Sequence, residues 1–146
     1  MDTSSRYREK ILVVDDHLAC REAVSMILQD SLKDDCEVRT AEHSYEALEL
    51  VEFWRPDLII QDIARPDMDG WEFLRELRKG HPSLPVIVLT AYSSELARRT
   101  SMEAGAFAHL TKPIDLEPFV HAVAQALAST KTSAAEAQTD LESASM

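Results

Sequence analysis

The sequence predicts an α/β fold in which helices cover both faces of a five-stranded parallel sheet. Five short apolar runs, each too short for a helix, alternate with segments of helical periodicity, which is the pattern of repeated β-α units. Most of these runs are continuously apolar, as expected for strands that are buried on both faces. At 146 residues the chain has the size of one domain.

The five runs predicted as strands are bounded by polar or turn residues. They are Ile11–Val14, Cys36–Thr40, Leu58–Ile60, Val86–Leu89 and Ala106–Leu110. The run Cys36–Thr40 alternates between apolar and polar residues, so we expect this strand at an edge of the sheet.

Five helices are predicted between and after the strands. Three follow from apolar stripes at helical spacing, namely Cys20–Leu28, Ala47–Trp54 and Leu116–Leu127. A fourth, Trp71–Lys79, is predicted to begin with a capping box of Asp69 and Glu72 and to end at Gly80.

The remaining helix, Ser94–Ala104, is predicted to be the least firmly docked. Its clear apolar residues are Leu96, Ala97 and Ala104, so little apolar area holds this helix to the sheet. Gly105 follows it and suits a left-handed helix end.

Composition limits the classes of function. The formal net charge of -11 repels the phosphates of nucleic acids and anionic lipids, so we expect neither direct nucleic-acid binding nor membrane association. The two cysteines, Cys20 and Cys36, are too few for a disulfide framework. No apolar run approaches the ~18 residues of a membrane span. These features predict a cytoplasmic protein.

The chain divides into three parts by composition. Residues 1–9 are predicted to form a flexible N-terminus, and residues 10–128 the folded domain. From residue 129 the chain consists largely of Ser, Thr, Ala, Glu and Gln, so it has little apolar area to offset the entropy of ordering. Residues 129–146 are therefore predicted to be a disordered tail or the start of a linker.

Polar side chains follow four of the predicted strands. Asp15 and Asp16 follow the first strand, Asp62 the third and Thr90 the fourth, and Lys112 comes shortly after the fifth. Ligands of open parallel sheets bind outside the carboxyl ends of the strands, so we expect these side chains to lie at one site.

Crowded carboxylates at this site need positive charge. Two carboxylates ~4 Å apart repel each other by about 4 kcal/mol at an effective dielectric near 20. Lys112 supplies one positive charge, and Mg2+, which prefers oxygen ligands, would supply two more. A site with a cation, a lysine, a hydroxyl group and a central carboxylate is suited to phosphoryl transfer, with the carboxylate as nucleophile.

Four motifs in the same order and spacing resemble the receiver domains of response regulators. They are the acidic pair in ILVVDDH, the segment PDLIIQDIARPDMDG, the strand VIVLTAY and the segment GAFAHLTKP. The resemblance covers residues 10–127. It implies a flavodoxin-like, doubly wound fold with strand order 2-1-3-4-5.

The resemblance also implies roles for individual residues. Asp62 would accept a phosphoryl group from a phosphohistidine of a partner. Asp16, Asp62 and the backbone carbonyl of Ala64 would bind Mg2+ directly, and Asp15 mainly through a metal-bound water. Thr90 and Lys112 would contact phosphoryl oxygens. The peptide bond before Pro113 would be cis, which is essentially confined to proline.

A receiver signals through a change of its surface rather than as an enzyme acting on other substrates. The resemblance implies a sensor histidine kinase or a histidine phosphotransfer protein as donor. The downstream protein would bind the face of the helix Ser94–Ala104, the last strand and the last helix, with a homodimer through that face as an open alternative. The chain would be a stand-alone receiver, a relay intermediate or a piece of a longer regulator.

His109 departs from the family pattern. Receivers usually have Tyr or Phe here, and that aromatic side chain turns inward together with the hydroxyl residue, Thr90 in this chain. Histidine is more polar and titrates near neutral pH, so the switch formed by Thr90 and His109 is expected to be weakened, altered or pH-sensitive, with a merely exposed His109 as the alternative. His17, next to the acidic pair, is expected to begin a helix rather than to bind metal.

Two other functions remain as alternatives. A Mg2+-dependent aspartyl phosphohydrolase would need a second acidic group as general acid and a cap that excludes water, and no insertion is long enough for a cap. A constitutive interaction module that no longer uses phosphate is suggested by His109, but Asp62, Thr90 and Lys112 are all present.

Overall fold

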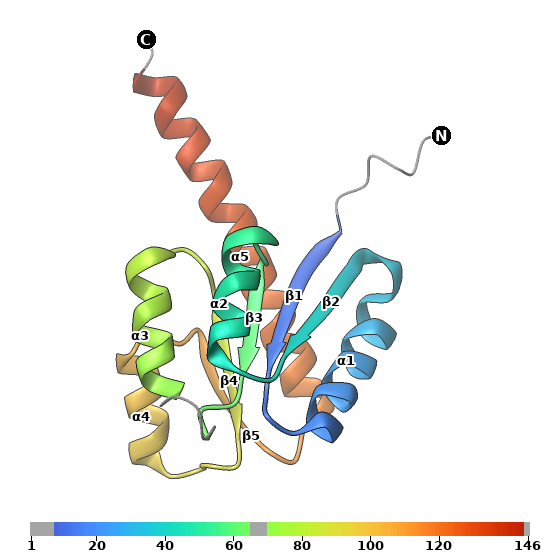
Figure 1. Cartoon of the computed structure of the whole chain (residues 1–146). Coiled ribbons are helices and arrows are strands. Elements are labelled where there is room, and N and C mark those ends of the chain that lie inside the picture. Colours follow the sequence, from blue (N-terminus) through green and yellow to red (C-terminus); the bar gives the residue numbers. More distant parts are fainter. Residues whose placement is uncertain (1–7, 65–69, 145–146) are drawn as a thin grey trace.

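The computed structural model describes residues 8–64 and 70–144. Strands and helices alternate along the chain (Figure 1). The strands are β1 (Glu9–Val14), β2 (Cys36–Ala41), β3 (Leu58–Gln61), β4 (Val86–Thr90) and β5 (Ala108–Thr111). The helices are α1 (Leu18–Leu32), a short 3-10 helix (Lys33–Asp35), α2 (Ser44–Phe53), α3 (Gly70–Gly80), α4 (Glu95–Glu103) and α5 (Leu116–Ala144).

The sheet confirms the predicted topology. All paired strands are parallel, and the strand order is β2-β1-β3-β4-β5. The alternating strand Cys36–Ala41 lies at an edge, as its pattern predicts. The other edge is β5.

Two apolar layers pack on opposite faces of the sheet, because successive side chains of a strand point to opposite sides. One face carries α2 and α3, whose apolar side chains meet alternate residues of β1 and β3 such as Leu12 and Ile59. The other face carries α1 and α5, which cover the intervening residues such as Ile11 and Ile60. Figure 1 shows α2 in front of the sheet and α5 behind it.

Several predicted boundaries differ from the structure. The last strand begins at Ala108 rather than at Ala106, because the N–H of Ala106 still donates to the carbonyl of Ser101 at the end of α4. Helix α3 begins at Gly70 and ends at Gly80. The proposed cap residue Asp69 lies outside the described residues.

Helix α4 has few buried side chains, as predicted. Ser94 accepts a hydrogen bond from the N–H of Ala97 and so caps the helix, but the buried residues of α4 are only Ala97 and Ser101. The prediction for Leu96 was wrong, since this side chain is 72% exposed. Gly105 after α4 has the predicted left-handed conformation, with a φ of 104°.

Helix α5 is longer than predicted. It continues to Ala144 and extends beyond the end of the sheet (Figure 1), whereas the sequence predicts a disordered tail from residue 129. The difference has a local cause, because Ala, Glu, Gln and Lys have high intrinsic helix propensity even without apolar burial. Leu116, counted in the apolar stripe of this helix, is 56% exposed.

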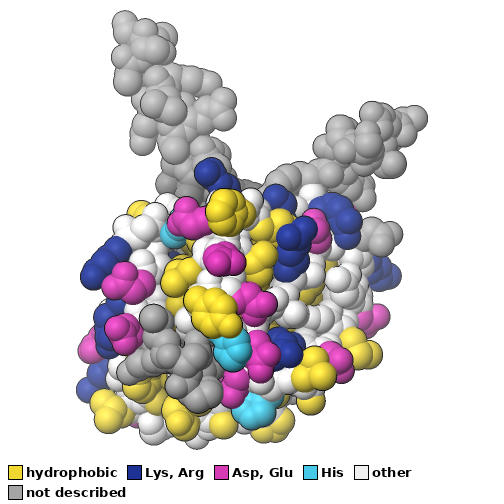
Figure 2. All heavy atoms as spheres, in the orientation of Figure 1, with side chains coloured by type: hydrophobic (Ala, Val, Ile, Leu, Met, Phe, Trp, Pro, Cys, Tyr) yellow, Lys and Arg dark blue, Asp and Glu magenta, His cyan; other side chains and the backbone are white. Residues whose placement is uncertain are grey.

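The surface around α2 mixes charged and apolar side chains. Figure 2 shows acidic, basic and hydrophobic side chains interspersed on this face. The exposed large hydrophobic residues of α2 are Tyr45 and Phe53. Among the described residues, none of the helices combines the length and the apolar character that crossing a membrane requires.

Candidate functional site

The strand register brings Asp15 and Asp62 to the same edge of the sheet. Val14 pairs with Gln61, so β1 and β3 end side by side and the two aspartates follow directly. The N–H of Asp62 donates to the carbonyl of Val14 at 3.0 Å, and the N–H of Asp15 donates to that of Ala41 at 3.1 Å. Both aspartates are buried.

Lys112 joins these two carboxylates. Its Nζ lies 2.8 Å from Asp15 Oδ2 and 2.8 Å from Asp62 Oδ2. A third contact runs from Nζ to Cys20 Sγ at 3.4 Å. An ammonium group has three N–H donors, so these three contacts account for all of them. The backbone N–H of Lys112 donates to the carbonyl of Thr90 at 2.7 Å, which fixes the base of the side chain. The peptide bond to Pro113 is cis, as predicted.

The environment of Lys112 stabilises its charged form. Burial alone would lower the pKa of this ammonium group, but the hydrogen bonds and negative charges of Asp15 and Asp62 outweigh that effect and raise its pKa. Lys112 is therefore a permanent positive charge between two buried carboxylates.

Asp16 completes an acidic cluster with Asp15 and His17. Its Oδ1 is buried and accepts no hydrogen bond from the described part of the chain. His17 Nδ1 lies 3.1 Å from this oxygen, without the geometry of a hydrogen bond. One ligand atom each of Asp15, Asp16 and His17 lies within 4.8 Å of the others. A buried carboxylate oxygen without a donor is costly, and a cation with oxygen ligands would satisfy it.

His17 begins α1, as predicted, but its ring also faces the carboxylates. It occupies the N-cap position of α1, and its N–H donates to Asp15 Oδ1 at 2.9 Å. Its ring nitrogen Nδ1 is 3.4 Å from the same oxygen. The side chain is 66% exposed, so it lies on the solvent side of the cluster.

The other predicted site residues lie around Asp62. Ala64 donates its N–H to Asp62 Oδ1 at 2.9 Å, while the metal-binding role of its carbonyl stays a prediction. Thr90 is fully buried at the end of β4, and its Oγ1 accepts a hydrogen bond from the N–H of Tyr92 at 3.3 Å.

His109 is held by residues outside the acidic cluster. Its Nδ1 lies 2.8 Å from Ser101 Oγ, and its Nε2 lies 2.9 Å from the carbonyl oxygen of Tyr92. Thr90 and His109 therefore both contact Tyr92, one through its N–H and the other through its carbonyl.

Sequence reasoning missed two residues that line the site. Cys20 contacts Lys112, and Arg21 donates from Nη1 to the carbonyl of Asp15 at 2.8 Å. Both lie in the first turns of α1, where the sequence pattern indicates a helix but not which side chains reach back toward the strand ends.

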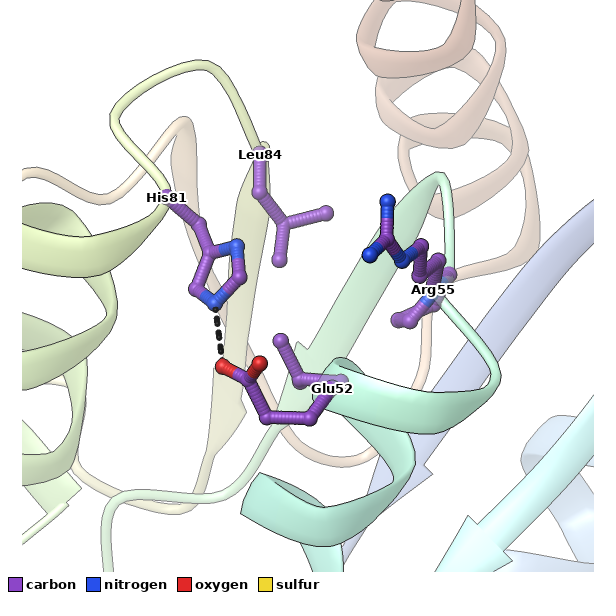
Figure 3. A pocket seen from close by; sticks show the side chains of 6 residues that line it. Glu52, Arg55, His81 and Leu84 are labelled. Atoms are coloured by element: carbon purple, nitrogen blue, oxygen red, sulfur yellow. Dashed lines mark hydrogen bonds and ion pairs between the residues drawn. The ribbon is translucent and has the colours of Figure 1, made fainter.

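A separate pocket of about 240 Å³ lies at the amino ends of β3 and β4 (Figure 3). In a parallel sheet the amino ends lie at the edge opposite the carboxyl ends, so this pocket is remote from Asp15 and Asp62. Glu52 Oε1 and His81 Nε2 lie 3.1 Å apart in it, and Arg55 approaches from the other side. It contains none of the residues predicted to carry chemistry.

Comparison with known proteins assigns the chain to a family. A family model described as the response regulator receiver domain matches residues 11–124. An uncharacterised 14.6 kDa protein in the sodA1 3' region of Leptolyngbya boryana is 40% identical over 118 residues, or 79% of this chain and 87% of the relative. Response regulator MprA of Mycobacterium sp. (strain KMS) is 40% identical over 108 residues, which cover 74% of this chain and 46% of that relative. The chain thus spans about half the length of MprA.

Solved structures agree with this assignment. The CheY-like response regulator receiver domain protein from Methanospirillum hungatei JF-1 is 29% identical, with a TM-score of 0.78 over 86% of this chain and 98% of that one. Chemotaxis response regulator CheY4 of Vibrio cholerae is 33% identical, with a TM-score of 0.73 over 82% of this chain and 99% of that one. The chain therefore belongs to the family of response regulator receiver domains, the signalling modules of two-component systems.

Proposed function

We propose that this receiver accepts a phosphoryl group on Asp62, with Mg2+ as cofactor, and signals through a change of its surface. The observation that carries the proposal is the Lys112 ammonium group, which lies 2.8 Å from both Asp15 Oδ2 and Asp62 Oδ2. This arrangement places a permanent positive charge against the carboxylate that would act as nucleophile. Phosphoryl transfer depends largely on such positioning and neutralisation of charge.

In the proposed reaction an oxygen of Asp62 forms a bond to the phosphorus of a phosphohistidine. The phosphorus–nitrogen bond breaks, and the imidazole of the donor leaves with the electron pair. All three N–H groups of Lys112 already have partners, so Lys112 must exchange one of them for a phosphoryl oxygen. Thr90 would donate its hydroxyl hydrogen to another phosphoryl oxygen.

The donor set of the acidic cluster fits Mg2+. Asp15, Asp16 and Asp62 carry three negative charges, and Lys112, which contacts two of these carboxylates, carries one positive charge. Asp16 Oδ1 is buried and has no hydrogen-bond donor within residues 8–64 and 70–144, and Mg2+ prefers oxygen ligands. Asp16, Asp62 and the carbonyl of Ala64 would hold the ion, with Asp15 acting through a bound water. When bound, Mg2+ neutralises charge on the carboxylates and on the phosphoryl oxygens.

The partners are proposed from the family to which the chain belongs. The phosphoryl donor would be a sensor histidine kinase or a histidine phosphotransfer protein in the cytoplasm. The downstream partner would be a protein that contacts α4, β5 and the start of α5, where Leu96 is exposed. The net charge of -11 disfavours direct binding to nucleic acid. A second copy of the chain on the same face is the alternative partner.

The test is intact-mass spectrometry after incubation with acetyl phosphate and Mg2+. We expect one added phosphoryl group on the wild-type chain, and none on Asp62→Asn or without Mg2+. Asp57→Asn is the matched control, because Asp57 precedes the same strand at its other end and its Oδ2 accepts the N–H of Lys10, a bond that an amide oxygen can also accept.

Other outcomes would overturn the proposal. An adduct of equal yield on Asp62→Asn would place the phosphoryl group elsewhere. No adduct and no release of phosphate from acetyl phosphate by the folded chain would favour the constitutive interaction module. Sustained hydrolysis of a small phosphomonoester would favour the phosphohydrolase.

A further inference from the structure

A chain of hydrogen bonds joins α3, α4, β5 and the segment between β4 and α4. Trp71 Nε1 on α3 donates to Ser101 Oγ on α4 at 2.9 Å. The same oxygen lies 2.8 Å from His109 Nδ1 on β5. The other ring nitrogen of His109, Nε2, lies 2.9 Å from the carbonyl oxygen of Tyr92. Four residues from separate elements are thus connected end to end.

The chemistry of the partners assigns the direction of each bond. An indole N–H can only donate and a carbonyl oxygen can only accept, so Trp71 donates to Ser101 and His109 Nε2 donates to Tyr92. In the neutral imidazole the remaining nitrogen, Nδ1, is an acceptor, so the hydroxyl of Ser101 donates to it. Ser101 then accepts from one side and donates to the other. Bonds aligned in this way reinforce one another.

Ser101 is the central residue of this series of hydrogen bonds, because its hydroxyl contacts both Trp71 and His109. It is fully buried, whereas the contact between His109 and Tyr92 is exposed. Loss of His109 would leave the buried hydroxyl of Ser101 without this acceptor, which costs more than the hydrogen bond contributes.

Helix α4 has little apolar contact with the sheet. Its buried residues are Ala97 and Ser101, both small. By comparison α3 buries Phe73, Leu74 and Leu77. Burial of apolar area scales with side-chain size, so apolar packing holds α4 much more weakly than α3.

We propose that Trp71, Ser101, His109 and the carbonyl of Tyr92 form a clamp that fixes α4 on the sheet, with Ser101 as its positioning residue. The clamp ties α4 both to the neighbouring helix α3 and to β5. It holds the exposed side chains of α4, including Leu96, in one position relative to β5.

The clamp also reaches the candidate site. Tyr92 donates its N–H to Thr90 Oγ1 at 3.3 Å and receives the bond from His109 at its carbonyl. A change in the hydroxyl of Thr90 would therefore reach α4 and α3 through Tyr92, His109 and Ser101. This link between Thr90 and the clamp rests on the proposed function, whereas the clamp itself does not.

The clamp is tested without a phosphoryl donor, by the indole N–H resonances in NMR and by amide hydrogen exchange. The chain has two tryptophans, so two indole resonances are expected, and Trp54→Phe identifies the one from Trp71. Ser101→Ala should move the Trp71 resonance, leave that of Trp54 in place and raise amide exchange in α4 about tenfold. Alanine favours helix more than serine does, so the variant is expected to fold.

Thr100→Ala is the matched control. Thr100 is the adjacent residue of α4, and its hydroxyl donates to the carbonyl of Leu96 in the same helix. This variant should leave the Trp71 resonance and the exchange of α4 close to those of the wild type. If Ser101→Ala and Thr100→Ala behave alike, there is no clamp.

His109→Phe provides a second variant at the other side of Ser101. It should also speed amide exchange in α4. Combining it with Ser101→Ala should increase the exchange rate little further, because both substitutions break the same series of hydrogen bonds. Fully additive effects would contradict the clamp. The nitrogen resonances of His109 in the wild type should show the tautomer that carries hydrogen on Nε2, and the opposite tautomer would overturn the assigned direction.

The link to Thr90 is tested with acetyl phosphate and Mg2+, with intact mass measured on the same sample. A shift of the Trp71 resonance that accompanies the adduct, and that is lost in Ser101→Ala, is the expected result. An adduct without this shift would overturn the link while the proposed function stands. No adduct at all would count against the proposed function and leave the clamp to be judged by the experiments without donor.

Discussion

Lys112 Nζ lies 2.8 Å from Asp62 Oδ2, although the two residues are 50 positions apart in the chain. The contact arises because β3 and β5 are separated by one strand, β4, and all three end at the same edge of the sheet. The lysine side chain is long enough to cross that edge. The same ammonium group contacts Asp15, so one cation stabilises two carboxylates.

Replacing Lys112 should destabilise the fold in the absence of metal. Lys112→Met leaves Asp15 and Asp62 without their cation, and both side chains are only 6% exposed. We expect a loss of about 3 kcal/mol in the free energy of unfolding, measured with urea in the presence of EDTA. Lys79→Met is the control, because Lys79 forms an exposed pair with Glu76, and it should cost less than about 1 kcal/mol. Equal losses in the two variants would contradict the central role of Lys112.

Asp16→Asn should have opposite effects on metal binding and on stability. Its buried Oδ1 has no hydrogen-bond donor among the residues that the structure describes, so removing the negative charge should leave the metal-free protein as stable as the wild type or more stable. Mg2+ affinity, measured by calorimetry, should fall about tenfold or more. Unchanged Mg2+ affinity would remove Asp16 from the proposed metal site.

Gly70→Ala should destabilise the contact between the start of α3 and Ile63. A Cβ at this position would lie 2.3 Å from Ile63 Cα and 2.7 Å from its carbonyl oxygen, and backbone atoms cannot move aside as a side chain can. We expect a loss of more than about 2 kcal/mol in urea unfolding. Gly80→Ala at the other end of α3 is the control, since no atom of the described residues lies within 4 Å of the added Cβ. A neutral Gly70→Ala variant would show that the close approach to Ile63 is relaxed in solution.

The thiol of Cys36 should make the stability fall at alkaline pH. This side chain is fully buried, and burial raises its pKa above the ordinary value. The folded protein therefore binds the thiol proton more tightly than the unfolded chain does. The resulting stability is fully present below about pH 8.5, the ordinary pKa, and is lost as the pH rises through the folded value.

Urea unfolding between pH 7 and pH 10 checks this prediction for Cys36. Cys36→Ala should lower the stability at every pH but flatten its decline with pH, while Cys20→Ala should keep the wild-type decline. An unchanged decline in Cys36→Ala would assign the pH dependence to other groups.

The sequence predicts the fold and the main charged residues because both follow from local patterns. Each apolar run corresponds to a strand within two residues, and the strand ends carry Asp15, Asp62 and Lys112, which the structure brings together. Because the strands are parallel, their carboxyl ends meet at one edge of the sheet, and the side chains that follow them lie close together there.

Contacts that depend on side-chain packing could not be predicted in the same way. Nothing in the sequence indicates that Ser101 lies between Trp71 and His109, because the three residues belong to different elements. The contact of Cys20 with Lys112 likewise depends on where α1 sits relative to β5. The length of α5 is hard to predict because low apolar content favours disorder, whereas the helix propensity of Ala, Glu, Gln and Lys favours a helix.

Locating the phosphoryl group on the chain decides whether Asp62 is the acceptor. An acyl phosphate is reduced by borohydride to an alcohol, so the chain treated with acetyl phosphate and Mg2+ can be reduced, digested and mapped by mass spectrometry. The proposal that Asp62 is the acceptor predicts homoserine at position 62 and unmodified aspartate at positions 15 and 16. Reduction at Asp15 or Asp16, or none at Asp62 in a chain whose intact mass shows the adduct, would contradict it.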